Sequence, residues 1–505
     1  MYDVAIIGAG VIGGAIAREL SRYALSIVIL EKENDISAGA SKANSGIVHA
    51  GYDPEENTLM AALNVQGNRM YDKMCEELSV PFQRNGSLVL AFDGAQLSRI
   101  AALKRRGDNN GVPGLELLSG EELRALEPAV SPDAKGALYA KTAGITDPML
   151  LTVSMIENAV MNGADCFLNF EVAAIKKEDG YYRLFAAGGQ GQGQGLGQGQ
   201  GMGLGLGQGQ GQSQSQSQSQ VETKCVVNAA GVFSDKVHDM AAQPAYRITP
   251  RRGQYFLLDK EDGDLVRSTL FPCPTEAGKG VLVAPSVHGN LLLGPASDSV
   301  LDGDDTGTTD EALASARAGA RLLVLKASTR NTIRTFAGVR AEADAGDFII
   351  KEADGSPGFI DVAGIKSPGL SAAPAIALRV ASLIEETGLA LERKEDFDPI
   401  VRRMLLKDMP EECQAALIAE NPLYGRVVCR CETITEGDIV DSINRPVGAT
   451  TLDAVKRRCR AGMGRCQGGF CGPKVQQILA RELNKPLPEI MLEGKASYIL
   501  TGRTK

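Results

Sequence analysis

The sequence predicts an α/β protein that also contains an α+β region with an antiparallel sheet and a small, mainly helical C-terminal domain. Three observations predict this class: a strand, glycine turn, helix and strand at the N-terminus, short β runs separated by turn residues over about 245–300, and a cysteine-rich segment after residue 425. Alternating strands and helices are typical of a parallel sheet covered by helices, whereas closely spaced β runs favour an antiparallel sheet.

The first element is a strand over residues 3–7 (DVAII), which leads into Gly8, Gly10 and Gly13 and then into a helical stretch. A second apolar run, SIVIL, ends at Glu31, 18 positions past the third glycine. In a Rossmann-like fold the glycine turn holds the diphosphate of a dinucleotide, and the acidic residue accepts a hydrogen bond from the adenosine ribose. A lone glycine motif is often only a turn, but its flanking strand and acid predict a dinucleotide site. They do not indicate which dinucleotide.

A Gly, Gln and Ser tract over residues 188–220 separates two β-like runs, YYRLFAA and VETKCVVNAAG. The tract is too polar to bury a core, so we expect a disordered insertion in a surface hairpin. Because closure entropy grows with the logarithm of loop length, this insertion costs only about 2 kcal/mol more than a short turn. A repeat expansion without function is the simplest interpretation, and an interaction tract is the alternative.

Composition limits the class of protein. The 505 residues, 44% of them apolar, suffice for roughly three domains with their own cores. A net charge of -9 argues against nucleic acid or an anionic membrane surface as a general partner. The first strand leaves no room for a signal peptide, and the sequence contains no apolar stretch long enough to span a bilayer. We therefore expect a cytoplasmic protein without an integral membrane segment.

Four cysteines near the C-terminus form two closely spaced pairs. Cys429 and Cys431 form a CxC motif, and Cys466 and Cys471 form CxxxxC within GMGRCQGGFC. Two thiolate pairs on glycine-rich loops suit a two-iron cluster, because each iron needs two protein sulfurs. Residues 425–474 carry nine Lys or Arg against five Asp or Glu. Cations beside an anionic cluster stabilise its reduced form, although a solvated basic face is an equally good interpretation.

Three histidines are candidates for the base that a hydroxyl-bearing substrate requires, because neutral imidazole suits proton removal at neutral pH. His49 lies in NSGIVHAGY, directly after the second strand of the dinucleotide fold, and is the preferred candidate. His288 lies between two β runs of the expected substrate sheet and is a weaker one. His238 is expected to be a surface or satisfied helix residue.

Two cations next to small residues are candidates for binding an anionic substrate group. Arg340 lies in AGVRAEAD and Lys279 in GKGVLV. Arginine offers a two-pronged match to a carboxylate or phosphate, and lysine offers a point charge. A solvated surface group is the alternative for both, and Arg251 and Arg252 are weaker candidates still. Residues 364–386 run from a Gly/Pro turn into an alanine-rich helix, whose first N–H groups could face an electron-rich ring.

These motifs, in this order, resemble the flavin-dependent glycerol-3-phosphate dehydrogenases and oxidases, which are D-amino-acid-oxidase-like FAD enzymes. The matching segments are DVAIIGAGVIGGAIARELS, ILEKE, NSGIVHAGY, VVNAAG, GVR and SPGLSAAPAIA, over roughly residues 1–390 without the Gly/Gln tract. CRCETITEGDIV and AGMGRCQGGFC resemble the [2Fe-2S] domain related to bacterioferritin-associated ferredoxin, over about 425–475.

The resemblance implies FAD as the dinucleotide, His49 as the base, and Arg340 and Lys279 as substrate contacts. It also implies a [2Fe-2S] cluster on the four cysteines. Relatives of the ferredoxin domain often have CxxC as the second pair, so the CxxxxC spacing and the nearby Cys459 leave the last ligand slightly open. The residues expected to contact FAD are Gly8, Gly10, Gly13, Glu31, Ser45, Gly46, Ala230, Gly231, Gly338, Ser367, Gly369, Leu370 and Ser371.

The function implied by this resemblance is FAD-dependent oxidation of sn-glycerol 3-phosphate to dihydroxyacetone phosphate. Electrons would leave through the cluster to a redox partner subunit or quinone-linked acceptor, through which the protein could lie peripherally at a membrane. The alternatives are an L-2-hydroxyglutarate dehydrogenase, an amino-acid dehydrogenase of the same fold, or a non-catalytic electron-transfer subunit.

The expected domains follow from these assignments. An FAD-binding domain comprises residues 1–78, 145–244 and 335–394, and a substrate domain comprises 79–144 and 245–334. A linker or helical segment over 395–424 then leads to a [2Fe-2S] ferredoxin-like domain and tail over 425–505.

Overall fold

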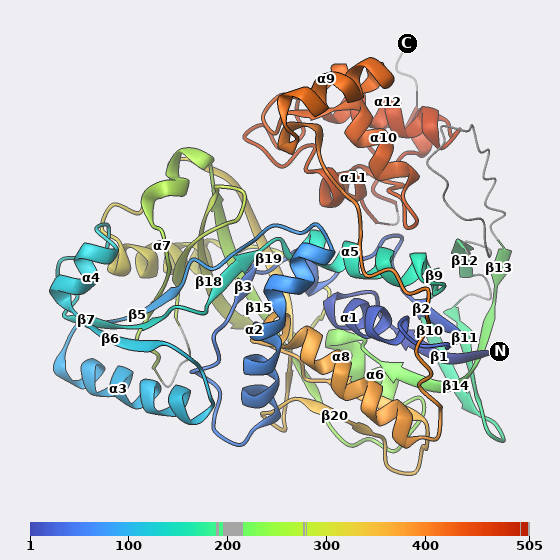
Figure 1. Cartoon of the computed structure of the whole chain (residues 1–505), viewed down its shortest axis with the longest axis horizontal. Helices are drawn as coiled ribbons and strands as arrows, with labels where there is room; N and C mark the ends of the chain where they lie inside the picture. The colour runs from blue at the N-terminus through green and yellow to red at the C-terminus, as the bar shows by residue number, and fades with distance from the viewer. Residues whose placement is uncertain (188–190, 195–215, 276–277, 279, 495, 503–505) are drawn as a thin grey trace.

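The chain folds into two large sheets with a small helical domain above them (Figure 1). The computed structural model describes residues 1–187, 191–194, 216–275, 278, 280–494 and 496–502. In the described residues a ten-stranded sheet carries the N-terminal strand, and an eight-stranded sheet lies beside it. The α/β class with a mainly helical C-terminal domain is confirmed. The division into domains stays a prediction.

The ten-stranded sheet has a parallel centre, in which β1 lies between β14 and β2, while β2 also pairs with β9 and β14 with β21. Its central strands are nearly all apolar because helices cover the sheet. The members of this sheet are β10 (Val172–Lys177), β11 (Tyr182–Ala186), β14 (Gln220–Asn228), β1 (Tyr2–Ile7), β2 (Ile27–Leu30), β9 (Asp165–Phe167), β12 (Gly191–Gln194), β13 (Gln216–Gln218), β20 (Ile349–Glu352) and β21 (Phe359–Ala363).

The strands that flank the Gly/Gln tract pair as predicted, because β11 and β14 form an antiparallel pair with Leu184 opposite Val221. The structure differs from the expectation of a wholly disordered 188–220 at both ends of the tract. Residues 191–194 form β12, residues 216–218 form β13, and β14 begins at Gln220. Backbone amides can pair without apolar side chains, and a reading of side chains alone misses this. Residues 188–190 and 195–215 lie outside the described residues.

The eight-stranded sheet contains the short β runs predicted near 245–300 and is antiparallel except where β16 pairs with β5. The order across it is β19 (Thr332–Ala343), β15 (Ile248–Leu258), β18 (Leu291–Ser299), β17 (Leu282–Pro285), β16 (Thr269–Pro272), β5 (Ser87–Ala91), β7 (Gly136–Ala140) and β6 (Leu115–Ser119). A small sheet joins the two parts and contains β3 (Ile47–Val48), β8 (Gly144–Thr146) and β4 (Phe82–Gln83).

Helices α1, α2, α5 and α8 pack on one another beside the parallel strands, and α7 covers part of the antiparallel sheet (Figure 1). Their packing buries a continuous apolar core. The α-helices of the described residues are α1 (Val11–Leu20), α2 (Leu59–Glu77), α3 (Gly94–Asn109), α4 (Gly120–Leu126), α5 (Pro148–Met161), α6 (Ser234–His238), α7 (Asp310–Leu323), α8 (Gly369–Glu386), α9 (Glu411–Glu420), α10 (Glu436–Asn444), α11 (Leu452–Cys459) and α12 (Gly472–Glu482).

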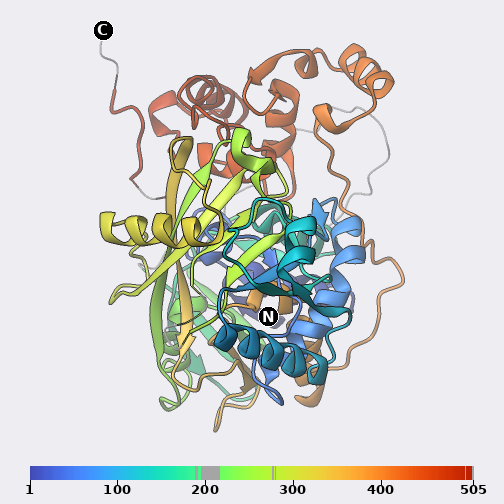
Figure 2. The same ribbon diagram turned by 90° about the vertical axis from the view of Figure 1, so that its left-hand side faces the viewer.

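The C-terminal domain holds α10, α11, α12 and a hairpin of β22 (Val427–Cys429) and β23 (Ile434–Thr435) around its own apolar cluster. It lies across the top of the molecule in both ribbon views (Figures 1 and 2). Of the segment predicted as helical linker, residues 395–405 are irregular and α9 is its one α-helix. The irregular part is held to the larger body, since Arg403 pairs with Glu157 at 2.6 Å.

Two buried carboxylates fix this domain on the dinucleotide-binding part. Asp35, just beyond β2, pairs with Arg457 and Arg458 of α11, each at 2.7 Å. Glu157 of α5 pairs with Arg403 and with Arg445, which follows α10. Because such carboxylates are stable in a core only when paired, these contacts fix the position of the C-terminal domain.

Candidate functional site

A cavity of about 1440 Å³ opens where the carboxyl ends of the parallel strands face the antiparallel sheet. Its walls include the glycine turn after β1, strands β15, β18 and β19 of the second sheet, and residues of the C-terminal domain. Cavities at the carboxyl ends of parallel strands are the usual ligand sites of such sheets.

The glycine turn has the geometry that a dinucleotide diphosphate requires. Gly8 has φ of +107°, and a Cβ on Gly13 would lie 1.9 Å from the Gly8 carbonyl oxygen, so both positions need glycine. Gly10 is the N-cap of α1, where the first backbone N–H groups point out of the helix. The Val11 N–H donates to Ser41 Oγ at 2.8 Å, which places a hydroxyl at the end of the helix as well.

Glu31 lies in the wall of the cavity with its carboxylate oriented by the backbone. Its Oε2 accepts from the Ala9 N–H at 2.8 Å and its Oε1 from the Glu33 N–H at 2.9 Å. Burial raises the pKa of Glu31, although these two N–H groups oppose the rise. Each oxygen keeps a second lone pair, so the carboxylate can still accept from a ribose hydroxyl. The turn and this acid therefore fit an adenine dinucleotide.

His49 follows β3 and lies in the same cavity. Its Nε2 is 3.1 Å from Ser367 Oγ, its main-chain N–H donates to Ser371 Oγ at 2.7 Å, and its ring lies 5.9 Å from that of Phe271. Its carbonyl oxygen accepts from Asn68 at 3.0 Å. These contacts hold the imidazole at one place in the cavity wall, with a hydroxyl beside the nitrogen that could move a proton.

Arg340 lies on β19 and donates to Ser297 Oγ at 3.2 Å. Two neighbouring cations of the cavity, Arg251 and Lys366, both pair with Glu342, at 3.4 and 2.6 Å. No carboxylate of the described residues pairs with Arg340. Its guanidinium is therefore available to an anionic ligand, and it lies on β19 of the sheet that faces the glycine turn.

Three further segments position the wall. Gly46 has φ of +67° and its carbonyl oxygen accepts from the Thr146 N–H at 2.9 Å. A Cβ on Gly338 would lie 1.9 Å from the Ala43 carbonyl oxygen, so β19 can approach the 40–46 loop only with glycine there. The first turn of α8 brings Leu370 to the cavity, and Ser367 lines it just before this helix.

Most of the residues predicted from the sequence thus meet at one site. The cavity is lined by Gly8, Gly10, Glu31, Ser45, Gly46, His49, Ala230, Gly231, Gly338, Arg340, Ser367, Gly369 and Leu370. Gly13 and Ser371 stand behind this wall, the first supporting the glycine turn and the second holding the His49 backbone. Lys279 lies outside the described residues.

The other two histidines differ in their surroundings. His238 is buried, with Nδ1 at 2.7 Å from Asp361 and Nε2 at 2.9 Å from the Gln243 carbonyl oxygen, which is a structural role. His288 lines the cavity, and its Nε2 lies 2.8 Å from Asp147 Oδ2. Burial lowers the pKa of His288, while the Asp147 carboxylate opposes that shift.

The four cysteines of the C-terminal domain form two pairs, each with one member from either motif. The Cys431 thiol donates to Cys466 Sγ at 3.8 Å. The hydrogen bond from Cys471 lowers the pKa of Cys429 to about 6. Two thiolates with bonds of about 2.3 Å to one tetrahedral ion lie about 3.8 Å apart, so the separation of Cys431 and Cys466 fits one metal of a binuclear cluster.

Two further observations concern the ligand set. Within the described part of the chain, no three His, Cys, Asp or Glu side chains are grouped so that they could hold one metal ion, and the thiols meet as pairs instead. Cys459 donates to the Val455 carbonyl oxygen at 3.4 Å, and burial raises its pKa to about 12. It therefore has the character of a core thiol, which favours Cys471 as the last ligand.

The C-terminal domain also forms part of the cavity wall, which the sequence did not predict. Lys456, Arg457 and Arg460 of this domain face the cavity, as do Met463 and Gln467 of the loop that carries Cys466. These side chains follow no motif and reach the cavity only because buried ion pairs dock the domain. A single sequence therefore contains no pattern that would identify these side chains as part of the cavity.

The chain matches the family model of FAD dependent oxidoreductases over residues 3–383 and that of the BFD-like [2Fe-2S] binding domain over residues 427–481. It is 47% identical to a glycerol 3-phosphate dehydrogenase of Caloramator mitchellensis over 507 residues, covering 100% of this chain and 99% of the relative. It is similar to the solved structure of dithionite-reduced L-α-glycerophosphate oxidase from Mycoplasma pneumoniae with FAD bound (TM-score 0.70, 30% identity, 80% of this chain and 99% of that one). The human mitochondrial L-2-hydroxyglutarate dehydrogenase is 29% identical over 58% of this chain and 60% of its own length.

The glycine turn and the cavity define a dinucleotide-dependent α/β enzyme. The chain belongs to the family of FAD dependent oxidoreductases and carries a BFD-like [2Fe-2S] domain. Its cofactors are FAD and a [2Fe-2S] cluster, as predicted. None of the helices in the described ranges is both long and apolar enough to cross a bilayer.

Proposed function

We propose that this enzyme oxidises sn-glycerol 3-phosphate to dihydroxyacetone phosphate with FAD and passes the electrons through its [2Fe-2S] cluster. The observation that carries the proposal is that His49 and the carboxylate-free Arg340 line the same cavity as the glycine turn. The full-length similarity to a glycerol 3-phosphate dehydrogenase supports this substrate.

His49 serves as the base. Bound FAD would supply the hydride acceptor. As the hydride leaves the C2 carbon of the substrate, the C2 hydroxyl must lose its proton to the protein. His49 lines the cavity and its Nε2 can take this proton, while Ser367 Oγ at 3.1 Å from Nε2 orients the ring. Ser371 and Asn68 hold the backbone of His49 and so keep the imidazole in place.

Arg340 binds the substrate phosphate. A planar guanidinium can donate two parallel hydrogen bonds to a phosphate, and Ser297 already orients one of its nitrogens. Lys279 is proposed as a second cation, from the sequence alone. The Gly8 turn, Glu31 and the first turn of α8 would hold FAD, with Ser45, Gly46, Ala230, Gly231, Gly338, Gly369 and Leu370 along it.

The cluster domain serves as the outlet for electrons. Its cysteines lie in a domain whose other side chains, among them Lys456 and Met463, form part of the cavity wall. One cluster removes one electron at a time, which converts a two-electron oxidation into single-electron steps. A redox partner subunit and an association with a membrane through that partner are part of this proposal.

Initial rates of substrate oxidation with an artificial electron acceptor test the substrate. We expect a high kcat/KM for glycerol 3-phosphate and a low one for L-2-hydroxyglutarate, glycine and glycerol. Arg340→Met should raise KM for glycerol 3-phosphate by about two orders of magnitude, because a charge-assisted phosphate contact is lost. Arg251→Met is the matched control, since Arg251 pairs with a carboxylate, Glu342, and Arg340 does not. Activity with L-2-hydroxyglutarate but not with glycerol 3-phosphate would refute the proposal.

A further inference from the structure

One edge of the cluster site faces solvent. Cys429 and Cys471 are each 2% exposed, whereas Cys431 is exposed and Cys466 is half-buried. The pair of Cys431 and Cys466 therefore lies at the surface and the other pair lies inside. Neither of the outer thiols lines the flavin cavity.

A large aromatic side chain stands at this edge. Phe470, next to Cys471 in the loop that carries Cys466, is 87% exposed. Met463 and Gln467 of the same loop face the cavity, whereas Phe470 does not. The loop therefore has an inner side toward the flavin cavity and an outer side with an exposed aromatic ring. An aromatic residue is a common energetic centre of a protein interface.

Two exposed cations without a carboxylate partner lie in the segments that carry the cysteines. Arg430 lies between the two cysteines of the first motif, and Lys474 lies in the first turn of α12, three residues past Cys471. Both are exposed, and no carboxylate in the described ranges pairs with either. Because the thiol pairs bring the two segments together, Arg430 and Lys474 lie in segments that meet at the same cysteines. Arg465 adds no unpaired positive charge to this edge, since it pairs with Asp259 at 2.9 Å and with Glu261 at 2.6 Å.

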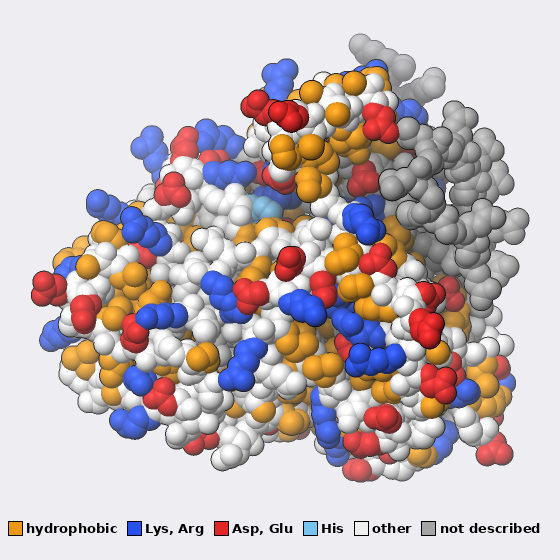
Figure 3. Space-filling model, viewed as in Figure 1, with side chains coloured by type: hydrophobic (Ala, Val, Ile, Leu, Met, Phe, Trp, Pro, Cys, Tyr) orange, Lys and Arg blue, Asp and Glu red, His pale blue; other side chains and the backbone are white. Residues whose placement is uncertain are grey.

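The rest of the surface makes this local charge distinctive. The chain has a net charge of -9, and Figure 3 shows cationic and anionic side chains interspersed over the face in view. A cationic edge on an anionic molecule produces a field that orients an approaching anionic partner. An apolar centre with a charged rim is the usual anatomy of a protein interface.

We propose that the surface formed by Arg430, Cys431, Cys466, Phe470 and Lys474, here called the outer edge, docks an acidic one-electron carrier protein. The proposal rests on the electron outlet proposed above. In the transfer, the cluster loses one electron and the oxidised redox centre of the carrier gains it, with no bond formed or broken. Oxidation of one substrate molecule reduces two carriers.

This assignment predicts a weak, salt-sensitive complex. Interfaces of electron carriers are small and short-lived, and their association is steered by charge. The outer edge offers one aromatic centre and two free cations, which suits such an interface. Binding should therefore weaken as ionic strength screens the cations.

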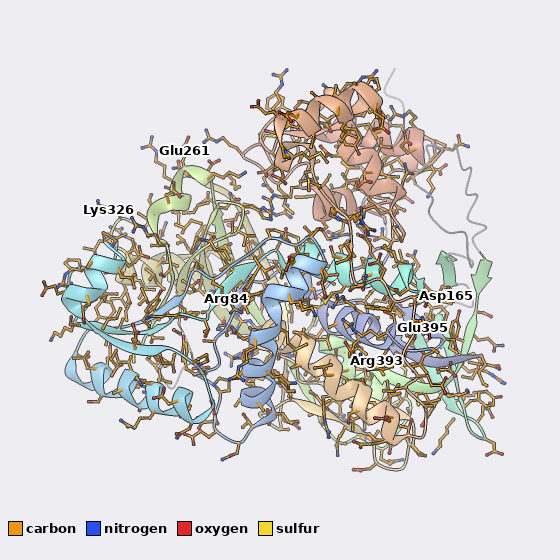
Figure 4. All side chains as sticks on the ribbon, viewed as in Figure 1. Arg84, Asp165, Glu261, Lys326, Arg393 and Glu395 are labelled. Carbon is orange, nitrogen blue, oxygen red and sulfur yellow. The ribbon has the colours of Figure 1, made fainter. Side chains whose placement is uncertain are left out.

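The test is binding of an acidic plant-type [2Fe-2S] ferredoxin to the oxidised holoenzyme, measured by calorimetry at low and high salt. We expect the wild-type protein to bind the ferredoxin at low salt and to lose about tenfold or more in affinity at high salt. At low salt, Phe470→Ala and the double variant Arg430→Glu/Lys474→Glu should each lose affinity by a similar factor. Leu325→Ala and Lys326→Glu are the matched controls. Both side chains are exposed just after α7, and Figure 4 labels Lys326 at the left of the molecule, whereas the C-terminal domain lies at the top right.

Binding of cytochrome c, a basic carrier, with equal or greater affinity would overturn the proposal. So would binding to phosphatidylglycerol vesicles in place of the ferredoxin, or a ferredoxin affinity that none of the variants alters. The visible absorbance of the cluster is measured in each variant. If a variant loses its cluster, the salt dependence of ferredoxin binding by the wild-type protein tests the proposal instead. No substrate is present, so failure of glycerol 3-phosphate as substrate would leave this test unaffected.

Discussion

His49 is held by three residues from two separate parts of the chain. Ser367 and Ser371 flank the start of α8, and Asn68 lies on α2, yet all three contact this histidine. The sequence predicts His49 as the base from its place after the dinucleotide strands. It could not predict Ser371 as the residue that holds the His49 backbone, because this contact spans 322 positions.

Replacing His49 by alanine tests its role. We expect His49→Ala to bind FAD normally and to reduce it about two to four orders of magnitude more slowly at neutral pH, since proton transfer to the base is lost. Stopped-flow absorbance in the absence of oxygen measures the rate. Ser367→Ala, which keeps the base, should be much less impaired. An unchanged rate in His49→Ala would assign His49 a structural role.

His288 should contribute a pH dependence to stability. Its folded-state pKa is lowered by burial, so the unfolded chain binds more protons than the folded one as pH falls below the ordinary value near 6.5. Stability should therefore decline as pH falls from 6.5 through the folded pKa. In calorimetric unfolding, the melting temperature of His288→Gln should fall less steeply with decreasing pH than that of the wild type. Parallel curves would contradict this assignment.

At the scale of elements, the glycine turn and the cysteine loops were predicted almost completely from the sequence. The expected strands and helix correspond to β1, α1 and β2, and the four predicted cysteines meet as two pairs. The pairing itself was unpredictable, because sequence spacing suggests pairs within a motif, whereas the structure pairs thiols across motifs. Glu31 was predicted to meet a ribose, but its backbone contacts required the fold.

Gly13→Ala should damage the dinucleotide site. Its Cβ would fall 1.9 Å from the Gly8 carbonyl oxygen, so β1 and α1 must separate and the turn must shift. We expect loss of most bound FAD and a lower melting temperature, measured by flavin absorbance and calorimetry. Gly94→Ala is the control, because a Cβ there meets no atom within 4 Å. Normal FAD content in Gly13→Ala would refute the assigned packing.

Serine substitutions distinguish the cluster ligands from the neighbouring core thiol. Cys466→Ser should lose the [2Fe-2S] absorbance or strongly alter it, whereas Cys459→Ser should retain the cluster because Cys459 is bonded within α11. Iron and sulfide analysis with visible absorbance measures both. Loss of the cluster in Cys459→Ser but not in Cys466→Ser would show that Cys459, and not Cys466, is a ligand.

On the scale of the molecule, docking of the C-terminal domain depends on buried charge. Burial raises the pKa of Asp35, but Arg458 and Arg457 outweigh it and hold that pKa below its usual value. Burial likewise raises the pKa of Glu157, but Arg403 and Arg445 outweigh this effect and hold the pKa below its usual value. The sequence predicts two larger parts and a small domain but not these contacts, because each joins residues hundreds of positions apart whose charges resemble those of any solvated surface.

Asp35→Asn should destabilise the whole protein, because two buried guanidiniums lose their counter-charge. A cost of about 3–5 kcal/mol is typical of breaking such a pair. Denaturant unfolding gives the change in free energy, and flavin fluorescence shows whether FAD is released at the same time. Asp304→Asn, which removes an exposed pair with Lys32, is the control and should change little. Equal stability of the two variants would show that the buried pairs do not hold the domain.

The most direct test of the account is the anaerobic addition of glycerol 3-phosphate to the purified protein, with flavin absorbance and the electron paramagnetic resonance of the cluster recorded together. We expect the flavin absorbance to be lost and the signal of a reduced [2Fe-2S] cluster then to appear within the same molecule. Reduction of the flavin without any cluster signal, or no reduction of either centre, would contradict it.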